Sequence, residues 1–258
     1  MSINYNKQKI NSLSNQIRLL EEKLEGERNK NENFSNLKHE VGRLNSLILS
    51  SAEKLNISSQ NREDLIKTIL YTSSMISSRM IYADLELNPQ AFEQQGTFSC
   101  GIYKKFHKAH HILSNLANNH GKKINLQGPS HFSIQAVSAF DCLPFILLDN
   151  AVKYAPDNTE ITVNFEENMS LNYPLNVKVE SIGPLITTEK ISQLTERGFR
   201  DEGALRTEIP GQGLGLYIAK QLCTLYDIEI SFSSTEKSGM SMNNIKYGYF
   251  GVHLKFRK

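Results

Sequence analysis

The stretch Phe145-Ile-Leu-Leu-Asp-Asn-Ala-Val-Lys-Tyr-Ala-Pro156 joins an apolar run to a group of polar side chains. Up to Leu148 it is typical of a buried helix. Asn150, Lys153 and Tyr154 then follow at spacings of three and four, so they share one helical face. An amide oxygen is a hard neutral ligand that suits Mg²⁺, and an ammonium is a point charge that suits a phosphate. The stretch predicts either a helix that faces a ligand or an ordinary amphipathic helix whose polar face meets water.

A glycine-rich stretch further along the chain favours the ligand. It runs Gly211-Gln-Gly-Leu-Gly-Leu216, so that Gly211, Gly213, Leu214, Gly215 and Leu216 come directly before a predicted helix that ends near Leu225. Glycines at a helix start let backbone N–H groups close on an anion, and the helix dipole favours negative charge there. No Gly-Lys-Ser or Gly-Lys-Thr follows, so the stretch is not a Walker A loop.

Together the two stretches resemble the N box and the G2 box of sensor histidine kinases, in the GHKL (Bergerat) superfamily that also holds gyrase and MutL. The resemblance runs from about Phe34 to the C-terminus. It implies an α+β fold in which a helical hairpin precedes a two-layer α/β sandwich of the Bergerat type. It also implies ATP and Mg²⁺ as ligands, with Asn150 as the metal ligand and Lys153, Tyr154 and the glycine-rich stretch around the nucleotide.

The segment Val179-Glu-Ser-Ile-Gly-Pro-Leu-Ile186 is similar to the family's G1 box. Gly183 and Ile186 stand where the resemblance expects ATP contacts. Ser181 replaces the aspartate that reads the adenine amino group, and Leu185 replaces the second glycine. The first departure predicts weak adenine recognition, and the second predicts a less adaptable loop.

The segment Arg197-Gly-Phe-Arg200 resembles the family's F box, and residues Asp201 to Pro210 would form a lid over the nucleotide. Leu194 stands where the family often has phenylalanine. The resemblance implies that Arg200 meets the terminal phosphates of ATP. The alternative is a solvated loop arginine.

His39 is followed by Glu40, and the pair resembles the family's phosphoacceptor box. A neutral imidazole nitrogen of His39 would attack the γ-phosphate, while Glu40 takes the proton of the other ring nitrogen. The alternative is an exposed helix histidine beside a charged residue. After Val41 the usual Asn/Thr-Pro-Leu is replaced by Arg43-Leu44-Asn45, which predicts little phosphatase activity. The cluster His107, His110 and His111 is typical of a solvated helix face.

Apolar spacing divides the chain into three expected parts. Residues 1–32 repeat apolar positions at three and four, from Ile10 to Leu24, and predict a coiled coil or one amphipathic helix packed on its own domain. Residues 33–92 predict two helices joined by a turn near Lys54 to Glu63. Their wide apolar stripes predict pairing into a dimeric four-helix bundle. Residues 93–258 would form the ATP-binding domain.

The third part mixes helical and strand-like patterns. After a linker from Leu87 to Thr97, helical spacing covers Ile102 to Asn118. Runs that alternate apolar and polar residues then predict half-exposed strands. They lie at 123–126, 132–134, 161–165, 177–179, 228–232 and 247–256. This mixture predicts helices on one face of a sheet.

The composition argues against nucleic-acid binding, a disulfide framework, secretion and a membrane span. The net charge of +2 gives no case for nucleic-acid binding, and three scattered cysteines suit a reducing compartment. The N-terminus lacks a signal-peptide pattern, and no apolar run reaches the length of a membrane span. We therefore expect a cytoplasmic protein.

The expected function is that of a homodimeric histidine kinase of a two-component system. It would phosphorylate His39 from ATP and pass the phosphate to an aspartate of a response regulator, under a separate sensory protein that acts on the N-terminal helix. Two alternatives stay open: a pseudokinase scaffold with little or no ATP turnover, and a GHKL serine kinase that acts on a partner protein.

Overall fold

The computed structural model describes residues 18, 21, 34, 35, 37–57, 61–87 and 95–257. The predicted coiled coil of residues 1–32 lies outside this range, except for Arg18 and Glu21. Both of these residues are helical and exposed.

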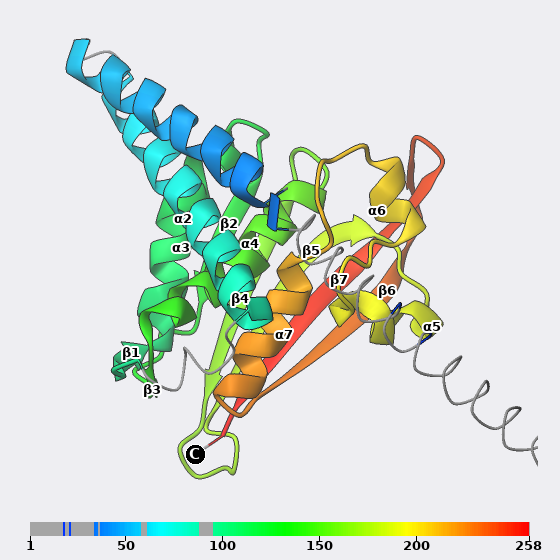
Figure 1. Ribbon diagram of the computed structural model, residues 1–258. Coiled ribbons are helices and arrows are strands. Elements are labelled where there is room, and N and C mark those ends of the chain that lie inside the picture. The colour runs from blue at the N-terminus through cyan, green and yellow to red at the C-terminus, as the bar shows by residue number, and fades with distance from the viewer. Residues whose placement is uncertain are drawn as a thin grey trace, which may run out of the picture.

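Two long helices form a hairpin at the N-terminal end of the described chain (Figure 1). The first covers residues 37–57, and the second is α2 (Arg62–Leu87). The predicted turn from Lys54 was placed too early, because the first helix continues through Ile57. Lys54 and Leu55 are good helix formers, so their helix propensity outweighs the polar composition of the segment. Asn61 has the left-handed φ of 57°, and its carbonyl accepts the Leu65 N–H at 3.0 Å.

A mixed five-stranded sheet follows, in the order β2-β4-β5-β7-β6. Its strands are β2 (Lys123–Gln127), β4 (Glu160–Glu167), β5 (Leu175–Pro184), β6 (Ile228–Met242) and β7 (Ile245–Phe256). β2 pairs with β4 in parallel, and the other pairs are antiparallel. The alternating burial along β5 puts Val177, Val179 and Ser181 on one face and Lys178 and Glu180 on the other.

Three helices cover one face of this sheet: α3 (Ile102–Asn118), α4 (Cys142–Tyr154) and α7 (Gly215–Leu225) (Figure 1). Their apolar side chains and those of the sheet form one core. Its largest fully buried members are Phe106, Phe140, Leu147, Leu148, Ile161, Ile218, Leu222 and Phe256, among others. A helical hairpin followed by a two-layer α/β sandwich is thus confirmed.

One strand was missed and another was predicted too short. β1 (Phe98–Gly101), which pairs antiparallel with β3 (Ser133–Ala136), was not among the predicted strands. A four-residue strand is too short to show an alternating pattern. β6 continues ten residues beyond Phe232, because its polar second half pairs with β7 at the sheet edge rather than with the core.

Short elements complete the chain beside the sheet. They are two 3₁₀ turns (Ser138–Asp141 and Ser192–Thr195) and the helices α5 (Thr188–Ile191) and α6 (Glu202–Arg206). α6 lies inside the predicted lid. No helix in the described part of the chain is both long enough and apolar enough to cross a membrane.

Candidate active site

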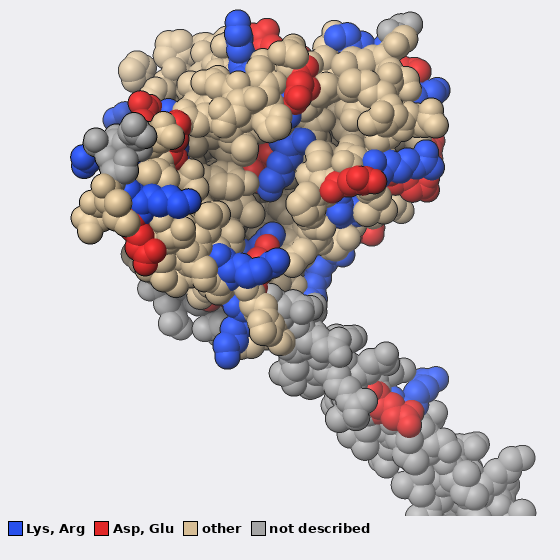
Figure 2. Space-filling model, turned by 90° about the horizontal axis from the view of Figure 1, so that it is seen from above, with Lys and Arg blue, Asp and Glu red and all other residues tan. Residues whose placement is uncertain are grey.

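One cavity lies between α4, β5, the start of α7 and the predicted lid, and α2 borders it from the hairpin side. Every residue predicted to bind ATP lines it: Asn150, Lys153, Tyr154, Ser181, Gly183, Ile186, Arg200, Gly211, Gly213, Leu214, Gly215 and Leu216. Met75, Ser78 and Arg79 of α2 line it as well, and no sequence motif pointed to these three residues. Figure 2 shows that the molecule is hollowed on one face and carries basic side chains in the depression.

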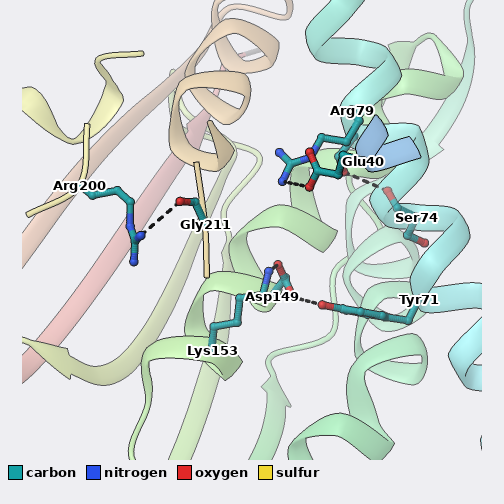
Figure 3. A network of polar contacts seen from close by, with 9 residues as sticks. Glu40, Tyr71, Ser74, Arg79, Asp149, Lys153, Arg200 and Gly211 are labelled. Atoms are coloured by element: carbon teal, nitrogen blue, oxygen red, sulfur yellow. Dashed lines mark hydrogen bonds and ion pairs between the residues drawn. The ribbon is translucent and has the colours of Figure 1, made fainter. Parts of the chain in front are cut away.

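Asp149 organises the polar end of α4. It is only 5% exposed, because it lies at the buried end of the apolar run. Its carboxylate accepts a hydrogen bond from the Tyr71 hydroxyl of α2 at 3.2 Å and one from the Lys153 ammonium at 2.5 Å (Figure 3). Burial and the nearby Asp149 charge raise the pKa of Tyr71, which stays a neutral donor. The Lys153 charge is therefore balanced inside the cavity.

Asn150 lies against the first residue of α7. A Cβ added to Gly215 would lie 3.2 Å from Nδ2 of Asn150 and 3.4 Å from Cγ2 of Ile146, which is tighter than ordinary contact. Glycine at this position lets the helix start approach the amide. Within the described residues, no hydrogen bond occupies the Asn150 side chain, so its oxygen is available to a ligand.

Gly213 is required for a reason that differs from the predicted one. Its φ is +68°, and an added Cβ would lie 2.5 Å from the carbonyl carbon of Gly198. Its carbonyl also accepts the Gly198 N–H at 3.2 Å. The residue thus packs the glycine-rich stretch directly onto the segment Arg197–Arg200, whereas close approach to an anion was the expectation.

Arg200 holds the predicted lid segment together. Its guanidinium donates to the carbonyl of Gly211 at 3.2 Å (Figure 3). It also donates to the carbonyls of Ala204 at 3.1 Å and Ile209 at 2.7 Å. The alternative of a solvated loop arginine is therefore wrong. Its Nε is buried and has no hydrogen-bond partner, although the side chain lines the cavity.

Ser181 lines the cavity from the helix-covered face of β5 and is 6% exposed. Among the residues with described positions, its hydroxyl has no hydrogen-bond partner. Glu180 lies on the opposite face and pairs with Lys178, so it does not replace the missing aspartate. Leu185 has an ordinary negative φ and donates its N–H to Lys246 at 2.8 Å, so the backbone here does not require glycine.

His39 is exposed on the first helix of the hairpin. Glu40 does not hydrogen bond to it. Instead, Oε1 of Glu40 accepts a hydrogen bond from Nη2 of Arg79 at 3.0 Å. Oε2 of Glu40 and Nε of Arg79 are both buried without partners. Arg79 therefore links the predicted phosphoacceptor pair to the cavity that it lines.

A second contact joins α2 to the sandwich, outside the cavity. Glu86 of α2 forms an ion pair with Arg197 at 2.9 Å and accepts a hydrogen bond from the Tyr217 hydroxyl at 3.2 Å. The Arg197 guanidinium also lies 5.6 Å from the ring centroid of Tyr82. Hence α2 is attached both to the segment before the lid and to α7.

The remaining titratable groups form no competing site in the part of the chain that the structure describes. His107, His110 and His111 lie on α3, but no three His, Cys, Asp or Glu side chains gather there or elsewhere to hold a metal. The three cysteines are buried free thiols.

Comparison with known proteins finds similarity in the C-terminal part of the chain. Residues 145–246 match the histidine kinase-, DNA gyrase B-, and HSP90-like ATPase family (HATPase_c). Histidine protein kinase SaeS of Staphylococcus aureus is 35% identical over 96 residues, which are 37% of this chain and 27% of the relative. This chain therefore matches about a quarter of that curated protein. The structure of full-length ShkA in complex with AMPPNP aligns with 88% of this chain and 46% of its own, with a TM-score of 0.53 and 13% identity, which shows the shared fold.

Proposed function

We propose that this chain, whose residues 145–246 match the histidine kinase-, DNA gyrase B-, and HSP90-like ATPase family, is an ATP-dependent protein-histidine kinase. ATP bound in the cavity phosphorylates His39, and the phosphate then passes to an aspartate of a response regulator. One observation carries the proposal. A single cavity gathers the residues of all the nucleotide-binding motifs and is bordered by the hairpin whose first helix presents His39.

The charges of the cavity suit the phosphates of ATP. Arg79 and Arg200 both line the cavity, together with Lys153. The Nε atom of each arginine is buried without a hydrogen-bond partner. Guanidinium groups match phosphate oxygens in geometry, so an anionic ligand in the cavity suits these side chains.

The oxygen atoms that could act as metal ligands in the cavity also suit Mg²⁺. The free amide oxygen of Asn150 is the kind of hard ligand that this ion accepts, with phosphate oxygens and water as its other ligands. Bound Mg²⁺ would neutralise charge on the phosphates during transfer. The absence of a cluster of three acidic or histidine side chains among the described residues agrees with an ion that arrives with its nucleotide.

The exposed imidazole of His39 is the nucleophile in this proposal. One ring nitrogen forms the bond to the γ-phosphorus, the bond from that phosphorus to the bridging oxygen breaks, and ADP leaves. The proton of the other ring nitrogen passes to the carboxylate of Glu40. In this structure Oε1 of Glu40 is paired with the Arg79 guanidinium, while Oε2 has no partner. A positive charge beside a carboxylate favours its ionised form and so opposes proton uptake.

The apolar surface of the hairpin suggests how two copies of the chain would pair. The hairpin exposes large apolar side chains at Leu47, Leu49, Ile57, Ile66, Leu70 and Met80. Pairing of two chains into a four-helix bundle would bury this surface, so we expect a homodimer. A response regulator would then meet His39 on the bundle. We also propose that a separate sensory protein acts on the N-terminal helix and that the protein is cytoplasmic.

Two alternatives have an observation in their favour. The serine at position 181 supports a pseudokinase, because a neutral hydroxyl cannot replace the charge-assisted hydrogen bond that a carboxylate accepts from an adenine amino group. The GHKL fold itself is compatible with a serine kinase that acts on a partner protein.

Incubation of the purified full chain with γ-labelled ATP and Mg²⁺, followed by acid or alkali, separates the three functions. A histidine kinase gives label on the chain that is lost in acid and kept in alkali. A serine kinase gives acid-stable label on an added partner and none on this chain. Absence of any label at saturating ATP would support the pseudokinase and contradict the proposal.

A further inference from the structure

We propose that Arg79 exchanges partners between Glu40 and the terminal phosphate of ATP, so that nucleotide binding itself frees the carboxylate that takes the proton of His39. This inference rests on the proposed function and adds a phosphate-binding residue supplied by the hairpin. In this proposal Arg79 detects the γ-phosphate by binding it, in addition to linking the two helices of the hairpin.

The ion pair between Arg79 and Glu40 is half satisfied. The side chains are 12% and 16% exposed, yet only one hydrogen bond of 3.0 Å joins them. A bidentate pair would use the second carboxylate oxygen and Nε, but both of these atoms are buried without partners. The pair is therefore held less firmly than its burial would allow.

The position of Arg79 gives it access to a nucleotide. It lies on α2 and lines the cavity together with Lys153 and Arg200. In Figure 3 the pair lies on the hairpin side, across from the segments that carry Gly211, Asp149 and Lys153. A cation thus reaches the cavity from the same pair of helices that presents His39.

The other two cations of the cavity are already engaged. Lys153 is neutralised by Asp149 at 2.5 Å, and Arg200 is bound by three backbone carbonyls. Arg79 instead is joined by one hydrogen bond of 3.0 Å to a carboxylate on a neighbouring helix. A γ-phosphate carries close to two negative charges and three acceptor oxygens, compared with a single charge on Glu40. Exchange therefore favours ATP, because ADP has no phosphate at the γ position.

Competition for one guanidinium makes a thermodynamic prediction. If Glu40 and the γ-phosphate both bind Arg79, each must weaken the binding of the other by the same factor. Removing the charge of Glu40 should then tighten ATP binding, leave ADP binding unchanged, and have no effect once Arg79 is gone.

Calorimetry on the full chain measures the affinities for ATP and for ADP in variants that lack the side-chain charge of Glu40, of Arg79 or of both. All of these variants also carry His39→Gln, which prevents phosphate transfer. Glu40→Gln is expected to tighten ATP at least about fivefold, at the lower limit of typical coupling. Arg79→Met is expected to bring the affinity for ATP close to that for ADP, and Glu40→Gln added to Arg79→Met should change neither. The double variant leaves no buried charge unpaired, so it remains informative if Arg79→Met alone unfolds.

Glu86→Gln is the matched control, because it removes another ion pair between α2 and the sandwich, outside the cavity. It should leave the ratio of ATP to ADP affinity unchanged. Suppose that the parent chain binds both nucleotides and phosphorylates His39. An unchanged ratio of ATP to ADP affinity in Glu40→Gln would then overturn the exchange but leave the kinase proposal standing. Failure of the parent chain to bind either nucleotide would overturn both.

Discussion

At the scale of single residues, Asn150 carries the expected metal contact. Asn150→Asp keeps the shape of the side chain but adds a carboxylate next to Asp149, so it changes how Mg²⁺ would sit against the phosphates. We expect labelling by γ-labelled ATP to be lost while the melting temperature stays close to that of the parent chain. Asn164→Asp on β4, away from the cavity, is the matched control and should label normally. Full labelling of Asn150→Asp would remove this residue from the site.

Ser181 gives a second prediction about one side chain. A carboxylate at this buried position would accept a charge-assisted hydrogen bond from the adenine amino group, whereas guanine has a carbonyl oxygen in the place of that group. Ser181→Asp should therefore tighten ATP relative to GTP by about 1–2 kcal/mol. Competition binding with both nucleotides measures it. A parent chain that already strongly prefers ATP, together with no change in the variant, would show that other groups read the base.

The motif residues of the cavity could be predicted from sequence because each motif is local. Asn150, Lys153 and Tyr154 share one helical turn, and the glycines precede a clear helix. Arg79 and Tyr71 could not be found in this way. Their partners lie 39 and 78 positions away in the chain, and only the packing of α2 against its neighbours brings them together.

At the scale of elements, the two glycines of the glycine-rich stretch should differ. Gly213→Ala strains a left-handed residue and forces a Cβ into the Gly198 backbone, whereas a Cβ at Gly211 would have its nearest neighbour at 3.9 Å. We expect Gly213→Ala to weaken nucleotide binding at least about tenfold, or about 1.4 kcal/mol, and Gly211→Ala to bind nearly as the parent does. Equal affinities of the two variants, measured by calorimetry, would contradict this packing role.

The contact between α2 and α4 gives another prediction at this scale. Tyr71→Phe keeps the ring, whose centroid lies 5.8 Å from that of Phe145, but leaves Asp149 one donor short. Losing a hydrogen bond to a buried charge should lower the free energy of unfolding by about 1–3 kcal/mol. Urea denaturation measures the loss. Tyr103→Phe on α3, whose hydroxyl has no hydrogen bond within the described residues, is a suitable control.

Elements with strong periodicity were predicted well, and weakly patterned ones were not. The helix expected over Ile102 to Asn118 has those bounds, because its apolar face recurs at regular spacing. The predicted turn near Lys54 began too early, and β1 was missed. β1 exists because it pairs with the distant strand β3, whereas the first helix continues through Ile57 because local helix propensity outweighs the polar composition of the segment.

At the scale of the whole molecule, α2 is the element that joins the helix of His39, the proposed phosphoacceptor, to the proposed nucleotide site. It contacts the first helix through Arg79, α4 through Tyr71, and the segment before the lid through Glu86. The sequence predicted the hairpin and the sandwich as consecutive parts. It could not predict that they pack against each other, since no local pattern encodes a contact between domains. The boundaries at residues 33–92 and 93–258 remain predictions.

Phosphate on His39 is the most direct test of the function proposed for this molecule. Parent chain, His39→Gln and His111→Gln should be incubated with γ-labelled ATP and Mg²⁺, and the acid-labile label on each counted. His111 is an exposed helix histidine on α3 and controls for the loss of an imidazole. We expect the parent and His111→Gln to label equally and His39→Gln to carry no acid-labile phosphate while still binding ATP. Undiminished acid-labile label on His39→Gln would contradict the assignment of His39 as the acceptor.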